Sequence, residues 1–75
     1  MTIVDVFEHK NKTAVYIEVS TDDIVPDSIS SIVVGNEAYK VIEYDVMSSI
    51  VGIVSIVVLV DAKDEIKIGQ SVVLK

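Results

Sequence analysis

The chain of 75 residues has no cysteine, no arginine and no tryptophan, and it contains only one proline and three glycines. Without cysteine it can form no disulfide, no thiol nucleophile and no cysteine-ligated zinc or iron–sulfur site. The three glycines lie far apart, so neither GxGxxG nor GxxxxGK[ST] is present, and no cofactor-binding loop is predicted. Twelve acidic residues against six lysines give a net charge of −6. An acidic chain without arginine is a poor candidate for direct contact with nucleic acid.

No segment of the sequence is typical of membrane insertion or export. The first ten residues, MTIVDVFEHK, lack a basic stretch followed by an apolar run, so they do not resemble a signal peptide. The longest apolar run, residues 50–60, is too short for a membrane-spanning helix, which needs about 20 residues. We expect a cytoplasmic protein with no membrane partner, and the absence of cysteine fits that location.

The residues that are abundant favour β-structure. Sixteen valines and eleven isoleucines stand against two leucines, and side chains branched at Cβ pack well on a pleated sheet. Residues 13–19 alternate strictly between two faces, which predicts a strand with one face on the core. The length allows a single domain, residues 1–75.

Turn residues divide the chain into about six segments, and this spacing is typical of a small all-β fold. We predict a closed or nearly closed antiparallel barrel, with a sandwich as the alternative. Pro26 is expected outside any central strand, Gly35-Asn36 in a tight hairpin because both residues tolerate positive φ, and Gly52 at a bulge. The predicted strands are residues 1–7, 13–19, 29–34, 39–46, 50–60 and 71–74.

The sequence offers no set of catalytic groups. The only histidine, His9, lies in the polar segment 8–12, where we expect an exposed turn residue. No acid, base and nucleophile can be named together, so we predict that the chain is not an enzyme and has no catalytic residues or cofactor.

Acidic residues gather in two turns, around residues 22–27 and 61–65. Neither turn has the Asp-x-Asp-x-Asp-Gly spacing of a calcium loop, so no metal site is predicted. Acidic turns are ordinarily solvated and also prevent the edges of strands from pairing with other chains. Calcium or ligand binding by these turns remains an alternative function.

Three tyrosines, Tyr16, Tyr39 and Tyr44, are candidates for contact with another protein, because tyrosine is a common interface anchor. The alternative is a place at the edge of the core. The negative net charge would steer a basic partner toward the chain. We therefore predict a small domain that binds another protein, and self-association stays open.

Several segments resemble domain II of the translation GTPases. They are residues 3–7 (IVDVF), the strand from Thr13 to Val19 followed by Asp23-Ile24, and the closing segments 41–43 (VIE), 51–53 (VGI) and 64–72 (DEIKIGQSV). The resemblance implies a six-stranded, largely antiparallel barrel that acts as an accessory module. It departs from the family pattern at Asp22, Asp27 and Gln70. The chain carries no GTP-binding segment, so no GTPase activity is implied.

A second resemblance supports a function of another class. Residues 32–41, with Gly35, Tyr39 and Val41, look like a hairpin found in small phage head–tail joining proteins. This resemblance implies a structural subunit that assembles with copies of itself or with a larger particle. A defined oligomer in solution would favour it over a binding module.

Overall fold

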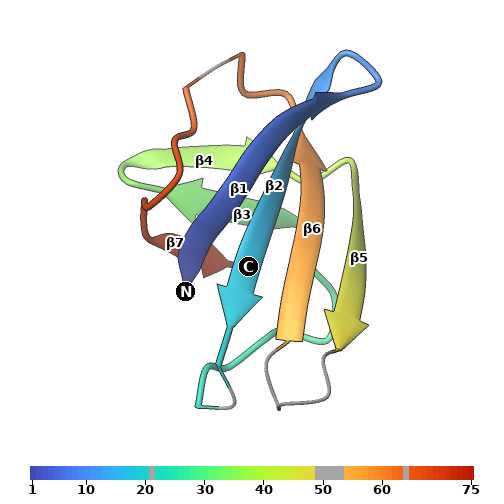
Figure 1. Cartoon of the computed structure of the whole chain (residues 1–75). Coiled ribbons are helices and arrows are strands. Elements are labelled where there is room, and N and C mark those ends of the chain that lie inside the picture. Colours follow the sequence, from blue (N-terminus) through green and yellow to red (C-terminus); the bar gives the residue numbers. More distant parts are fainter. Residues whose placement is uncertain (21, 49–53, 64) are drawn as a thin grey trace.

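A computed structural model describes residues 1–20, 22–48, 54–63 and 65–75, and these residues form two antiparallel sheets (Figure 1). One sheet has the strand order β1-β2-β6-β5 and the other β4-β3-β7. The described segments contain no helix, and hence none that is long and apolar enough to cross a membrane. The all-β prediction is confirmed, whereas neither sheet closes on itself within the described residues. The strands are β1 (Thr2–His9), β2 (Lys12–Val19), β3 (Ser31–Val34), β4 (Glu37–Lys40), β5 (Glu43–Ser48), β6 (Val54–Val60) and β7 (Val72–Leu74).

The core lies between the two sheets. Strands β2 and β6 occupy the middle of the four-stranded sheet, and their inward residues, such as Ile17 and its partner Ile56, are fully buried. The three-stranded sheet lies behind them, with its strands running across those of the first sheet (Figure 1). This confirms the strand and inward face predicted for residues 13–19. The main core cluster is Ile3, Val15, Ile17, Val19, Ile29, Ile32, Val34, Val41, Ile56, Val58, Val60, Ala62, Ile66, Val72 and Leu74.

A bulge in β1 lets this strand bond to segments of both sheets. The pairing with β2 shifts between Ile3 and Asp5, so Val4 is the extra residue. Bulges bend a strand and increase its twist. Before the bulge, the Ile3 amide donates to the Gln70 carbonyl at 3.0 Å, and the Gly69 amide donates to the Ile3 carbonyl at 2.8 Å. The start of β1 is thereby bonded to the segment that leads into β7.

The chain changes sheets a second time between β4 and β5. The Val41 amide donates to the Ser30 carbonyl at 2.9 Å, next to β3, whereas the next amide, that of Ile42, donates to the Leu59 carbonyl of β6 at 2.8 Å. The prediction of one strand over residues 39–46 is therefore wrong. Two strands form because the Val41 amide bonds next to β3 and the Ile42 amide bonds to β6. The described residues therefore contain seven strands.

The ends of two other strands also differ from the predicted ends. Strand β1 continues through Glu8 and His9, which were expected in a turn, and β5 includes Met47 and Ser48, which were expected in a connection. Cross-strand pairing explains both changes, because His9 pairs with Lys12 and Ser48 pairs with Val54. The bulge predicted at Gly52 and the start of the segment 50–60 lie outside the described residues.

The hairpins use two-residue turns of different kinds. Between β1 and β2, Lys10 and Asn11 both have positive φ, 54° and 62°, as a type I′ turn requires. Between β3 and β4, Gly35 has φ of 62°, but Asn36 is not among the residues with positive φ. The predicted Gly35-Asn36 hairpin is confirmed, with positive φ at Gly35. Glycine at the first central position alone is typical of a type II′ turn.

Lys10 is the least favourable residue in these turns, because a side chain with Cβ is strained at positive φ. Replacing it with glycine should raise the free energy of unfolding by roughly 0.5–1 kcal/mol, the relief of strain less the added entropy of the unfolded chain. Chemical denaturation measures the change. Lys10→Ala is the control, since it removes the charge and keeps the strain. Equal stability of the two variants would contradict the assignment.

Candidate functional site

The outer face of the four-stranded sheet is the face turned away from the three-stranded sheet, and it carries an apolar centre beside acidic residues. The strand register aligns its side chains in rows across the sheet. In two of these rows an acidic residue of β5 comes last. One row is Phe7, Ala14, Leu59 and Glu43, and the next is Asp5, Tyr16, Val57 and Asp45.

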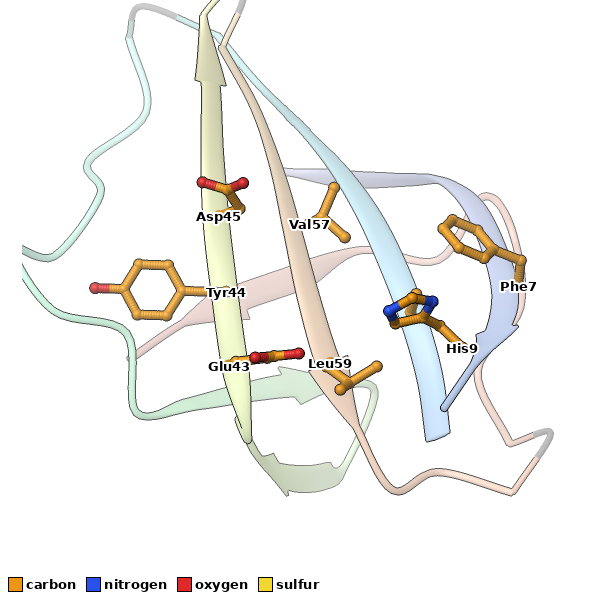
Figure 2. A pocket seen from close by; sticks show the side chains of 8 residues that line it. Phe7, His9, Glu43, Tyr44, Asp45, Val57 and Leu59 are labelled. Atoms are coloured by element: carbon orange, nitrogen blue, oxygen red, sulfur yellow. The ribbon is translucent and has the colours of Figure 1, made fainter. Parts of the chain in front are cut away.

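A groove of about 340 Å³ lies on this outer face. Figure 2 shows the Glu43 side chain extending from β5 toward Leu59, with His9 and Phe7 on the other side of the groove. The Tyr44 ring points away from β6 in the same view. The lining residues are Phe7, His9, Ala14, Glu43, Tyr44, Asp45, Val57 and Leu59.

The floor of the groove is apolar and well packed although no second sheet covers it. Ala14 is 3% exposed and Leu59 6% exposed, values otherwise found in the core. Phe7, on β1, stands beside Ala14 and packs against Tyr16 with ring centroids 5.4 Å apart and a tilt of 54°. Such a tilted aromatic pair contributes about 0.5–1.5 kcal/mol beyond its buried area. The pair therefore holds Phe7 in place as the wall of the groove on the β1 side.

The opposite wall is acidic, because Glu43 and Asp45 stand on β5 next to Leu59 and Val57 of β6. Lys10 reaches Glu43 from the β1–β2 hairpin, with its Nζ 3.6 Å from Oε1. Both side chains are exposed, so this ion pair contributes little to stability. Asp45 forms no salt bridge with any described residue. The wall therefore presents negative charge to solvent.

The titratable side chains that line the groove are those of His9, Glu43, Tyr44 and Asp45. Its lining includes His9 and two carboxylates but no serine, threonine, cysteine or lysine that might act as a nucleophile. Within the described ranges, no three residues of the types His, Cys, Asp and Glu are placed to hold a metal ion. His9 is exposed, as expected, and ends β1 instead of lying in the turn.

The three candidate tyrosines lie in different places and form no common patch. Tyr16 is on the outer face beside Phe7. Tyr44 pairs with buried Val58, so it belongs to the inner face of β5. Tyr39 is on β4, where it packs against the core and donates a hydrogen bond to Glu65 Oε2 at 3.0 Å. The groove residues Phe7, Val57 and Leu59 were not predicted, since only strand register brings them together.

Tyr39 makes the free energy of unfolding depend on pH in the alkaline range. Partial burial, the hydrogen bond to Glu65 and the charges of Glu65 and Glu37 raise its pKa above the usual 10.0. The protonated ring is thus favoured in the folded state, and its contribution is complete below pH 10 and is lost as pH rises through the higher folded pKa. Tyr39→Phe should cost about 0.5–1 kcal/mol at pH 7. Denaturation of both proteins at increasing pH should show this difference decrease above pH 10. A difference that stays constant as the pH rises above 10 would contradict it.

Three of the five described carboxylates in the acidic turns bond to other groups of the chain. In the first turn, Asp23 Oδ2 accepts hydrogen bonds from the Ser20 amide at 3.0 Å and the Ser20 hydroxyl at 3.2 Å. In the second turn, Asp61 pairs with Lys12 at 3.2 Å, and Glu65 accepts the bond from Tyr39. Asp64, which the calcium alternative also includes, lies outside the described residues.

A second hollow, of about 500 Å³, lies beside the β1–β2 hairpin. Charges of both signs line it, among them the pair of Lys12 and Asp61. Because these charges compensate one another, the lining of the hollow lacks the negative charge of the groove.

No family model, no curated protein and no solved structure matches this chain. The resemblance to domain II of the translation GTPases therefore rests on the sequence segments alone.

Proposed function

We propose that the chain is a non-catalytic domain that binds another protein, and that the partner occupies the groove on the outer face. The observation that carries the proposal is the groove on the face away from the second sheet, where the exposed Phe7 and the half-buried Val57 present apolar surface beside the buried Ala14 and Leu59. Apolar surface in an uncovered groove is typical of interaction sites. Phe7 adds an exposed aromatic side chain of the kind that anchors interfaces.

The charge around the groove favours a basic partner. Glu43 and Asp45 form one wall, and the whole chain carries a net charge of −6. Lysine and arginine side chains can place their apolar stems on such a floor while the charged end meets the carboxylates. The same field repels nucleic acid phosphates and anionic membrane surfaces.

We propose further that the two sheets form one barrel-like unit. Two features support this arrangement. The first is the hydrogen bonding between Ile3 and the segment that precedes β7, and the second is the two-residue connection from β4 to β5. Such a unit fits the resemblance to the accessory module of the translation GTPases. A partner from the translation machinery, bound through protein and not RNA, is therefore part of the proposal.

Affinity capture with matched variants tests the proposed function. The tagged chain is incubated with source lysate treated with nuclease, beside Phe7→Ser and the control Ile68→Ser. Both replaced side chains are exposed, Phe7 at 41% and Ile68 at 63%, but Ile68 precedes β7 and does not line the groove. Mass spectrometry identifies the bound proteins.

We expect that the wild type and Ile68→Ser retain at least one protein from the lysate that Phe7→Ser does not retain. Circular dichroism must show that Phe7→Ser is folded at the temperature of capture. Equal recovery by all three proteins would contradict the groove as the binding surface. Recovery of only the chain's own copies would favour the self-assembling structural subunit instead.

A further inference from the structure

Three of the four outermost strands of the two sheets are protected against pairing with another chain. Strand β1 has a bulge at Val4, and its first residues bond to the segment before β7. Strand β4 has only four residues, with Glu37 at its start and Lys40 at its end. Strand β7 has three residues, and Val72 at its start donates to the Met1 carbonyl. Bulges, short length and terminal charges are the devices that proteins use to protect edges.

Strand β5 has no bulge and is longer than β4 and β7, and the only protection of these kinds that it has is the charge of Glu43 at its start. It runs for six residues, EYDVMS, without proline or lysine, and its register with β6 is continuous. Among the described residues it pairs with β6 alone. All residues from Glu43 to Met47 are exposed. A long, regular and exposed edge strand is a template for strand addition.

The inner face of β5 carries apolar side chains that extend the core to a solvent-exposed edge. Tyr44 and Val46 pair with Val58 and Ile56, which are fully buried. Tyr44 is nevertheless 38% exposed and Val46 51% exposed. A strand added beside β5 with apolar residues on that side would therefore extend an existing apolar row.

We propose that β5 binds an extended segment of the protein partner as an additional strand of the four-stranded sheet. The segment alternates basic residues, which meet Glu43 and Asp45, with apolar residues, which meet Tyr44 and Val46. Its backbone pairs with the free edge of β5, and cross-strand pairs of opposite charge fix its register. This inference rests on the proposed function and names the chemistry of the partner.

Charge favours this partner over a second copy of the chain. Two copies of β5 related by a two-fold axis, paired antiparallel with Asp45 at the centre, would place the two Asp45 side chains directly opposite each other. If the axis passes through Tyr44, Glu43 of each copy lies opposite Asp45 of the other copy. If the axis passes through Val46, the two Asp45 side chains are diagonal neighbours. Like charges at such positions are destabilising. Lys10, which reaches Glu43 at 3.6 Å, shows that a basic side chain fits there.

The test uses a capped synthetic peptide of eight residues that alternates lysine and valine. Titration of the isotope-labelled chain, followed by NMR of the backbone amides, should shift the resonances of β5 more than those of β3 and β4. A peptide with its central valine replaced by proline keeps the charge but loses strand pairing, and should bind at least fivefold more weakly. A peptide of glutamate and valine should show no binding at millimolar concentration.

Charge reversal on the protein provides the matched comparison. Glu43→Lys with Asp45→Lys should weaken peptide binding about tenfold. The control Asp22→Lys with Asp27→Lys changes the net charge equally at two exposed loop positions and should leave binding within about twofold of wild type.

Each outcome separates this inference from the proposed function. Equal binding of the proline peptide, equal loss in both charge variants, or shifts in β5 caused by protein concentration alone would overturn strand addition. None of these results would alter the dependence of partner capture on Phe7, which tests the proposed function. Loss of that dependence would overturn the proposed function and, with it, this inference.

Discussion

Ile56→Ala is expected to lower the free energy of unfolding by about 3 kcal/mol, because it removes a fully buried side chain and leaves a cavity. Ile56 lies on β6 between β2 and β5, where it pairs with Ile17 on one side and Val46 on the other. A domain of this size has a total stability of only about 4–11 kcal/mol. Urea denaturation should show either a much lower midpoint or a protein that is partly unfolded without denaturant.

Val57→Ala is the control on the same strand. Val57 points to the outer face and is only partly buried, so its loss should cost less than about 1 kcal/mol. The contrast between two adjacent positions tests which face of β6 is the core. Equal costs would show that the assigned register is wrong.

Ile3→Pro should be at least as destabilising, with an expected loss of about 3 kcal/mol or more. The substitution removes the amide that donates to the Gln70 carbonyl and replaces a side chain that is almost fully buried. The start of β1 should then separate from the segment before β7. Hydrogen exchange at the Gly69 amide, which donates to the Ile3 carbonyl, reports this separation directly.

Ile3→Val separates the two causes, since it keeps the backbone donor and removes one methylene. It should cost about 0.5–1.5 kcal/mol and leave the exchange of the Gly69 amide slow. If Ile3→Pro keeps the wild-type stability and the Gly69 amide remains protected, the hydrogen bonds between β1 and the segment before β7 do not join the sheets.

The sequence predicts those strands in which one local signal dominates. The alternation over residues 13–19 correctly predicts β2 and its inward residues Val15, Ile17 and Val19. It fails at Ala14, which is buried on the opposite face beside Phe7, a residue of another strand. The division between β4 and β5 also cannot be predicted from the local sequence. No glycine or proline marks it, and it depends on which distant carbonyl each amide meets.

The groove depends even more on long-range pairing. Phe7, Leu59 and Glu43 come from three separate strands, and only the register across β1, β2, β6 and β5 aligns them in one row. Composition predicts an acidic surface and a basic partner, and both remain predictions. The tyrosines were chosen for residue type alone, which does not indicate the face on which each of them lies.

The most direct test of the central claim is amide hydrogen exchange of the chain alone and in complex with the partner that capture recovers. The account predicts slower exchange in the complex for β5 and for β1 from Asp5 to His9, which border the groove, with β3 and β4 unchanged. Protection confined to β3, β4 or the acidic turns would contradict binding at the outer face.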